Sequence, residues 1–463
     1  MTVTVAAPTP GLLHARTDAG VRTGATAALW LSLLLVTYWW LTGSGLQDLG
    51  GWASGLTSSG RLTGLVASVL LLAQVILMAR VPILERAFGQ DRLARQHRLV
   101  GFTSFNLMLA HVVLITWGYA LGDLGQVPQT FWNLTVNYPG MLLALGGTLA
   151  LVMVVVTSIK AARRKLRYES WHLIHLYAYL GVGLALPHQL WTGTDFTSSP
   201  GRTVFWWTAW ALAAGAVLVW RVGLPLWTNV RHGLRVTSVV PEAPGVWSVY
   251  VTGRRLHRLR VEAGQFLAWR FLGRPGWTRA NPYSLSAAPD GRSLRITVAE
   301  VGDGSSGLAA LTPGTRVLVE GPYGRLTDRA RTRDRVAYFG AGVGITPLRA
   351  LAEGSPYAWG DAVMFQRFSH EPLFRRELDV LARERGLQVV ELPGRRRADG
   401  SWLGTTPDVG GVDDATVLRH WLPDLAERDV YVCGPPAWTD SLVNALLIAG
   451  LPADQLHLEN FSW

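Results

Sequence analysis

Six apolar runs, each about 20 residues long, are the feature that most restricts how this chain can fold. They lie near residues 24–43, 62–80, 98–120, 139–159, 172–191 and 203–226, and none contains Asp or Glu. A helix of this length crosses the roughly 30 Å hydrocarbon core of a bilayer. The first run lacks a small-residue cleavage site, so we expect a retained span rather than a signal peptide. The sequence therefore predicts an all-α bundle of six transmembrane helices over residues 24–228, after a short N-terminal segment, 1–23.

Basic residues are concentrated in two of the loops between these runs. Residues 80–98 contain five arginines and residues 160–167 contain five lysines or arginines, whereas the other three loops hold only Arg61 and Arg202. The positive-inside rule then places both termini and the two basic loops in the cytoplasm. We expect a multi-pass protein of the cell membrane. Basic loops at a lipid bilayer also explain the net charge of +11, so nucleic acid is not an expected partner.

The second half of the chain has a different pattern, because residues 231–463 hold 25 of the 32 acidic residues. Short alternating segments predict an antiparallel β-barrel domain over 229–330, with strands at 234–240, 246–252, 265–271, 283–287, 294–299 and 316–320. The next segments alternate with helical stretches and predict an α/β domain with a parallel sheet over 331–463, with strands at 335–339, 362–367, 387–391 and 429–433.

Cys433 is the one cysteine of the chain. A single cysteine excludes an intrachain disulfide framework, a cysteine-rich zinc or iron–sulfur site and a covalent C-x-x-C-H haem. Any metal centre must therefore use histidine, carboxylate or backbone ligands.

Two histidines on the third run and two on the fifth have spacings that suit haem ligation. His97 and His111 are 14 residues apart, so they lie within about 40° of each other around a helix and about 21 Å apart along it. His175 and His188 are 13 residues apart, which is about 140° on an ideal helix, so this pair requires a distortion for which Pro187 is the expected cause. Imidazoles without carboxylates suit two axially ligated haems, one at each membrane level.

The alternative for any single histidine in a span is a hydrogen bond to a neighbouring helix. We prefer that interpretation, or a contact with a haem propionate, for His172. For the four paired histidines the matched spacing on two runs favours metal ligation.

A glycine-rich segment follows the first strand of the predicted parallel sheet. Glycines permit close approach of the backbone to a phosphate, and the amides of a helix N-terminus attract an anion. The residues that would form this cradle are Gly340, Gly342, Gly344, Thr346 and Pro347.

A second segment, on a barrel strand, combines a base, an aromatic ring and a hydroxyl. It could hold a flavin, with the ring face on the tyrosine, the hydroxyl near a ring nitrogen and the positive charge near the pyrophosphate. Taken alone, a plain strand entry after proline is the better interpretation. The residues are Arg279, Asn281, Pro282, Tyr283 and Ser284.

From about residue 24 onward the chain resembles the ferric reductase and NADPH oxidase family of transmembrane flavohaem proteins. The resemblance is carried by His-x13-His and His-x12-His, by Asn-Pro-Tyr-Ser-Leu-Ser at 281–286, by Gly-Pro-Tyr-Gly at 321–324, by the glycine-rich segment and by Cys-Gly-Pro-Pro at 433–436. It implies two haems b held by the four paired histidines, FAD and NADPH, with NADH also possible.

The resemblance also assigns roles to single residues. It makes Tyr283 and Ser284 the contacts of the flavin ring, and it places Cys433 beside the nicotinamide with Gly434 and Pro435. The other assignments are a flavin pyrophosphate segment that contains Gly302, Ser305 and Ser306, and a C-terminal tail that contains Glu459 and ends with Trp463 against the flavin.

The function expected from this resemblance is electron transfer from cytoplasmic NAD(P)H through FAD and two haems to an extracytoplasmic acceptor. Oxygen, giving superoxide, and a ferric or cupric ion remain open as acceptors, and the sequence gives no oligomeric state. Arg367 is a candidate for recognition of the NADPH 2′-phosphate, with Arg395 and Arg396 as weaker ones and a surface arginine as the alternative. A different class of function is a membrane-anchored cytoplasmic flavin reductase or partner-binding module without transmembrane electron flow.

Overall fold

The computed structural model describes residues 10–166, 168–274, 276–302, 305, 307–395, 397, 400–405 and 411–460. Backbone contacts separate two compact units. One is Gly20–Gly223, and the other is Leu224–Trp463 together with Met1–Ala19.

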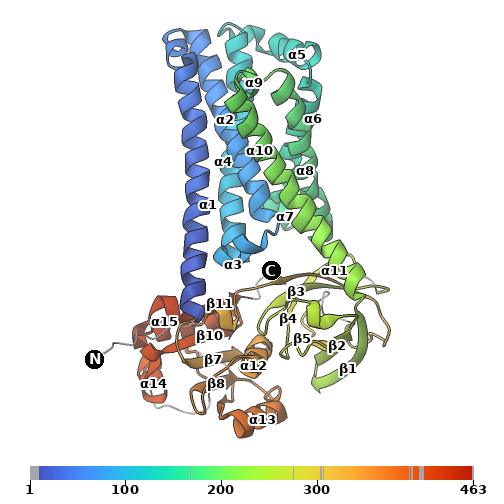
Figure 1. The fold of residues 1–463 in the computed structure, drawn as a ribbon, viewed down its shortest axis with the longest axis vertical. Helices are drawn as coiled ribbons and strands as arrows, with labels where there is room; N and C mark the ends of the chain where they lie inside the picture. The colour runs from blue at the N-terminus through green and yellow to red at the C-terminus, as the bar shows by residue number, and fades with distance from the viewer. Residues whose placement is uncertain are drawn as a thin grey trace, which may run out of the picture. The chain divides into compact units, whose positions relative to one another are not determined.

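The unit 20–223 is built from long helices that run side by side (Figure 1). They are α1 (Pro10–Trp40), α2 (Trp52–Met78), α4 (Gln90–Tyr119), α6 (Met141–Ser158), α8 (Tyr168–Trp191) and α10 (Pro200–Ala216). Short helices lie in the connections: α3 (Pro82–Phe88), α5 (Val127–Asn137), α7 (Lys160–Arg163) and α9 (Thr194–Thr197). Helix α10 continues as a π-helical segment, Val217–Gly223, and then as α11 (Leu224–His232).

Among the described residues, five helices are long and apolar enough to cross a membrane: His14–Gly45, Trp52–Met78, Gln90–Tyr119, Met141–Ser158 and Pro200–His232. The expected count was six. The predicted fifth run does form a helix, α8, which spans 24 residues and continues through Pro187. Its three histidines, its proline and Gln189 make it less apolar than the other five, so its composition does not identify it as a span.

The large apolar side chains of this unit point outward to an unusual extent. Trp30 and Leu34 of α1, Leu142 of α6 and Leu212 of α10 are all exposed, so this pattern recurs on three different long helices. Soluble proteins rarely expose contiguous apolar surface of this kind, whereas a bilayer offers it an apolar solvent. This is therefore a multi-pass membrane protein.

The first part of the other unit is a closed antiparallel arrangement of six strands. They are β1 (Arg235–Ala243), β2 (Val246–Thr252), β3 (Phe266–Phe271), β4 (Asn281–Ser284), β5 (Ser293–Ala299) and β6 (Val317–Tyr323). They form two sheets in the orders β1-β2-β5 and β4-β3-β6. Single bridges, Arg235–Arg316 and Leu285–Ile296, join the two sheets on both sides, as the barrel prediction requires.

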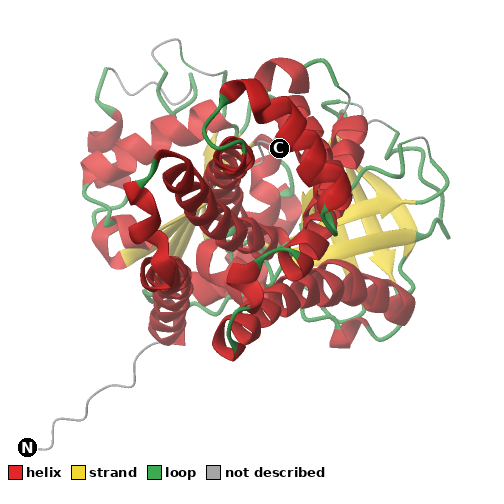
Figure 2. Cartoon of the chain, turned by 90° about the horizontal axis from the view of Figure 1, so that it is seen from above, coloured by secondary structure: helices red, strands yellow, loops and turns green. Residues whose placement is uncertain are grey.

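The second part is a parallel sheet in the order β11-β10-β7-β8-β9. Its strands are β7 (Arg335–Ala341), β8 (Ala362–Arg367), β9 (Gln388–Leu392), β10 (Arg428–Gly434) and β11 (Leu456–Asn460), and its helices are α12 (Ile345–Gly354), α13 (Arg375–Arg385), α14 (Asp414–Trp421) and α15 (Pro436–Ala449). Four of the strands match the predicted ones, and β11 is an addition at the edge. The strands of the whole unit form two groups in Figure 2.

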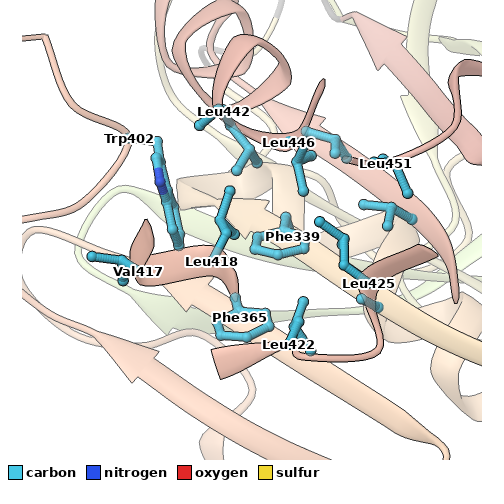
Figure 3. Packing of buried hydrophobic residues seen from close by; sticks show 14 of the residues in the cluster. Phe339, Phe365, Trp402, Val417, Leu418, Leu422, Leu425, Leu442, Leu446 and Leu451 are labelled. Atoms are coloured by element: carbon cyan, nitrogen blue, oxygen red, sulfur yellow. The ribbon is translucent and has the colours of Figure 1, made fainter. Parts of the chain in front are cut away.

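Aromatic side chains fill one face of the parallel sheet. Phe339 of β7 and Phe365 of β8 stack with ring centres 4.5 Å apart, and Trp402 meets Phe339 edge-on at 5.6 Å. Leucines of α14 and α15, such as Leu418 and Leu442, pack around these rings (Figure 3). This core fixes the carboxyl ends of β7, β8 and β10, where α/β proteins bind ligands.

Candidate functional site

The four paired histidines lie on helices that each pack closely against a second helix. Helix α4 packs antiparallel to α2 through small residues, so that a Cβ added at Gly64 would lie 2.5 Å from Nδ1 of His111. Helix α8 packs in the same way against α6, where a Cβ at Gly147 would lie 2.7 Å from the carbonyl oxygen of Gly181. Glycine at these contacts is what lets the backbones approach.

The histidines of α4 and α8 lie at two levels. The ring centres of His97 and His175 are 6.1 Å apart, with their planes inclined by 69°. At the other level, His188 lies within electrostatic range of His111. The structure thus brings together the residues that the sequence predicted as partners, and α8 achieves this without a break in the helix at Pro187.

The spacing of His97 and His175 fits two axial ligands of one metal. A metal–nitrogen bond of about 2 Å on each side and about 1.1 Å from each nitrogen to its ring centre give roughly 6 Å in total. Within the described residues, α4 and α8 make few close backbone contacts with each other. The residues present therefore fit a haem held between these helices.

Two ligand candidates on α4 are oriented by backbone carbonyls of α2. Nδ1 of His97 is 3.3 Å from the carbonyl oxygen of Gln74, and Nδ1 of His111 is 2.7 Å from that of Gly60. A carbonyl can only accept a hydrogen bond, so each Nδ1 carries the proton and each Nε2 keeps its lone pair. This is the tautomer that a metal at Nε2 requires.

Ser158 of α6 orients His175 in a similar way. Its hydroxyl donates to the carbonyl oxygen of Val154 at 2.7 Å and accepts from Nε1 of Trp171 at 3.2 Å. Because its one proton is used, the hydroxyl must accept from Nδ1 of His175, which is 3.4 Å away. His175 therefore also presents the lone pair of Nε2.

Arg61 and Arg202, the arginines of the three less basic loops, bind the same carboxylate. Arg61 makes two contacts with Asp195, at 2.8 and 2.9 Å, and Arg202 makes a third at 3.0 Å. Their charges are therefore compensated within the protein. Asp195 was not singled out from the sequence. The available signal was that Asp195 lies in the same short loop as Arg202.

The predicted flavin contacts lie on the short strand β4. Ser284 is buried, and its hydroxyl has no hydrogen-bond partner among the described residues. Burial raises the pKa of Tyr283 to about 12, which Arg274 and Arg279 oppose, so its phenol is neutral. Buried polar atoms are normally paired, so the unpaired hydroxyl fits a missing ring nitrogen of FAD. Asn281 and Pro282 are half-buried at the start of the same strand.

The predicted pyrophosphate segment is only partly described. The hydroxyl of Ser305 is buried and is engaged in a local turn, where it accepts from the amides of Val301 and Gly302. Ser306 and the terminal Trp463 lie outside the described residues, so their expected contacts with the flavin stay predictions.

A row of contacts joins the flavin strand to the parallel sheet. Ser284 pairs with Phe266 of β3, which also pairs with β6. A Cβ at Gly324, just beyond β6, would lie 2.9 Å from the carboxylate of Glu459. Glu459 of β11 in turn pairs with Cys433 of β10. Cys433, expected beside the nicotinamide, and Glu459 of the C-terminal tail are thus linked through β6 and β3 to the flavin motif.

Cys433 is fully buried where the glycine-rich loop meets β10. A Cβ at Gly344 would lie 2.2 Å from the carbonyl oxygen of Cys433, so only glycine fits there. Burial, and to a lesser degree Glu459, raises the pKa of the Cys433 thiol well above its usual range. The thiol is therefore protonated at neutral pH.

The rest of the glycine-rich loop leaves the backbone at Gly342, just before α12, accessible to a ligand. Gly342 has φ +55° and no atom within 4 Å of an added Cβ, whereas Gly340, Thr346 and Pro347 are buried beneath it. At the end of β10, Gly434 is buried and Pro435 is exposed. This arrangement can receive a pyrophosphate on backbone amides.

Arg367 lies at the end of β8, beside Ala341 of the glycine-rich strand. It is not the surface arginine considered as an alternative, because it is only 6% exposed. Its guanidinium donates to the carbonyl oxygens of Phe368 at 2.8 Å and Gly394 at 2.5 Å, and burial lowers its pKa.

An ionic cluster of two buried arginines and a partly exposed glutamate near the flavin strand was not predicted. Arg295 of β5 makes two contacts with Glu377 of α13, at 2.7 and 2.9 Å, and Arg349 of α12 lies 2.6 Å from the same carboxylate. Both arginines also donate to the carbonyl oxygen of Ser286, two residues after Ser284. The signal available was a charged arginine between two apolar residues, Leu294 and Ile296, inside strand β5. We call Arg295, Arg349 and Glu377 the clamp.

Comparisons with known proteins agree with this division. A family model described as "Ferric reductase like transmembrane component" matches residues 63–186. Ferredoxin–NADP reductase B of Sorangium cellulosum is 32% identical over 49% of this chain and 96% of its own length. The ferredoxin reductase component of a 3-ketosteroid-9-alpha-monooxygenase from Mycolicibacterium smegmatis is 32% identical over 51% of this chain and 67% of its own. A ferredoxin NADP+ reductase from Neisseria gonorrhoeae, solved with FAD and NADP, is 17% identical over 50% of this chain and 99% of its own, with a TM-score of 0.41.

The fold and these matches define an NAD(P)H-dependent flavin oxidoreductase of the ferric reductase type. The chain belongs to the ferredoxin reductase family through its second half, an FAD/NAD(P) module that is joined to a ferric reductase-like transmembrane domain.

Proposed function

We propose that this protein transfers electrons from cytoplasmic NAD(P)H across the membrane to an acceptor on the opposite side. Oxygen, giving superoxide, and a ferric or cupric ion are the two acceptor classes. When bound, FAD supplies the change from a two-electron donor to single electrons, and two haems b supply one-electron carriers at two membrane levels. In this proposal α8 is the sixth span, both termini are cytoplasmic, and the FAD and NAD(P) domains are 229–330 and 331–463.

The observation that carries the proposal is the pairing of histidines between α4 and α8. The ring centres of His97 and His175 are 6.1 Å apart, so these residues could hold one iron between them, and three of the four rings have Nδ1 bonded to protein. A passive membrane anchor has no use for such an arrangement. His97 and His175 would hold the inner haem, and His111 and His188 the outer one.

In the soluble half the chain's own residues would bind and orient the other two groups. Ser284 would donate to the flavin ring and Tyr283 would cover its face. Amides at Gly342 and the start of α12 would bind the dinucleotide pyrophosphate. Cys433 would face the nicotinamide as a neutral thiol, which unlike a thiolate does not attack an electrophilic ring.

A spectrum of the purified full-length protein tests the proposal. We expect two haems b per chain in a pyridine haemochrome assay, and reduced-haem bands after anaerobic addition of NADPH. A protein with FAD but without haem would instead be the membrane-anchored flavin reductase. The variant His257→Ala, at an exposed position of the soluble half, is the control and should keep both haems.

A further inference from the structure

Helix α2 carries none of the four candidate histidine ligands, yet it makes the shortest hydrogen bond to one of them, His111. The carbonyl oxygen of Gly60 is 2.7 Å from Nδ1 of His111, a short hydrogen bond for an imidazole N–H. One turn further, the Cβ that Gly64 lacks would lie 2.5 Å from the same nitrogen and 2.8 Å from Cε1. Any side chain at Gly64 would therefore push the ring away from the carbonyl of Gly60.

The second histidine at this level has no such support. Nδ1 of His188 is buried and makes no hydrogen bond of normal geometry within the part of the chain that the structure describes, although the backbone of Ala185 lies near enough to interact with the ring. On its backbone side, α8 is held close to the start of α6, since a Cβ at Gly140 would lie 2.7 Å from the amide nitrogen of His188. The two rings of the outer pair are therefore held differently: His111 through its imidazole and His188 through its backbone.

We propose that Gly60 and Gly64 of α2 are positioning residues for the outer haem, which they influence through His111. The inference rests on the proposed function, because it assumes that His111 ligates iron. A hydrogen bond from Nδ1–H to a carbonyl makes Nε2 a stronger donor, which favours the oxidised metal. Gly64 provides the space that this bond needs. Since His188 lacks a bond of comparable geometry, the contact from α2 is the strongest hydrogen bond to this pair of rings.

The variant Gly64→Ala tests the proposal, with Gly215→Ala as the matched control. Gly215 lies on α10, and no atom is within 4 Å of its added Cβ. A potentiometric titration followed by haem absorbance should show two midpoints in the wild type. We expect Gly64→Ala to move one midpoint to a higher potential, or to lose one haem of the two, and to change one of two low-spin EPR signals. Gly215→Ala should leave both midpoints and both signals unchanged.

Unchanged midpoints and EPR signals in Gly64→Ala would overturn the inference while the proposed function stands. A wild-type protein without haem would overturn the proposed function itself. If Gly64→Ala does not fold, pulsed EPR of the wild type with ¹⁵N-labelled histidine decides. One haem should then show two unequal remote nitrogens, one of them with a strongly hydrogen-bonded proton. Equal remote nitrogens in both haems would contradict the proposal.

Discussion

Ser284 and His188 share a rare property for single residues. Each has a buried polar atom for which the described residues provide no hydrogen bond. Leaving such an atom unpaired costs about 1–3 kcal/mol, so native proteins retain very few of them. Both atoms lie where the sequence placed a cofactor, Ser284 in the flavin motif and His188 in a ligand pair. For Ser284 the simplest physical explanation is that its hydroxyl is paired only when the flavin is bound, whereas an iron at Nε2 of His188 would leave its Nδ1 unpaired.

Ser284→Ala should therefore weaken FAD binding. Loss of one hydrogen bond to the ring is worth about 1–2 kcal/mol, which corresponds to a roughly 5–30-fold higher Kd. Titration of the FAD-free protein with FAD, followed by flavin fluorescence, measures this. Ser441→Ala is the control, because that hydroxyl is exposed on α15 and bonds only its own helix. Equal FAD affinity in Ser284→Ala would place the ring nitrogen elsewhere.

Arg367→Ala should reduce the preference for NADPH over NADH. A charge-assisted bond to a 2′-phosphate is worth about 1.5–3 kcal/mol, so the ratio of kcat/KM for the two donors should fall at least about tenfold. The exposed Arg376→Ala is the control. Arg367→Lys distinguishes binding of the phosphate by charge from hydrogen bonding to the loop. Lysine keeps the charge but cannot bridge the carbonyls of Phe368 and Gly394. A ratio that is the same in all three variants would leave Arg367 a purely structural role.

At the scale of elements, the clamp ties the barrel strand β5 to helices α12 and α13. Burial opposes the charge of Glu377, but Arg295 and Arg349 outweigh it and hold the pKa of this carboxylate below its usual range. A carboxylate with a lowered pKa stabilises the folded state fully above its usual pKa of about 4.3, and this contribution is lost as the pH falls through the lower folded-state value.

Glu377→Gln should therefore destabilise the soluble half at neutral pH and much less in acid. Because Glu377 is about a third exposed, we expect a loss of about 2 kcal/mol, below the about 3–5 kcal/mol of a fully buried pair. This corresponds to an FAD-release temperature about 4–8 °C lower at pH 7. The difference from wild type should shrink as the pH falls below about 4.3 towards the lower folded-state pKa. Glu384→Gln, exposed on the same helix, should match wild type.

Helices and strands were predictable from the sequence where neighbouring residues alone define them. The strands at Val246–Thr252 and Ala362–Arg367 end at the predicted residues, because apolar periodicity and turn residues bound them. Helix α8 was predicted as a helix, but its histidines make it less apolar. Its assignment as a sixth membrane span therefore depends on the pattern of histidine ligands. The clamp was missed because Arg295 and Glu377 are 82 residues apart, and no local pattern relates them.

At the scale of the whole molecule, the proposal separates two reactions that a single variant can distinguish. His188→Ala should abolish electron delivery across the membrane and leave reduction of FAD by NADPH intact, since its ring lies in the helical unit and the nucleotide site in the other. Proteoliposomes with NADPH outside and an impermeant acceptor inside measure delivery, and stopped-flow flavin bleaching measures the first reaction. His257→Ala should retain both. Undiminished delivery in His188→Ala would exclude it as a ligand on the path.

The 14-residue interval between His97 and His111 has an electrical consequence. In the proposed orientation, an electron that passes between these levels carries negative charge through most of the membrane field, and no carboxylate lies in the apolar runs to send a proton with it. A potential of 100 mV, negative inside, does about 2.3 kcal/mol of work on each electron that crosses the full field. The potential thus drives the current, and the current discharges the potential. Sustained turnover would require an outward flow of cations through some other membrane protein.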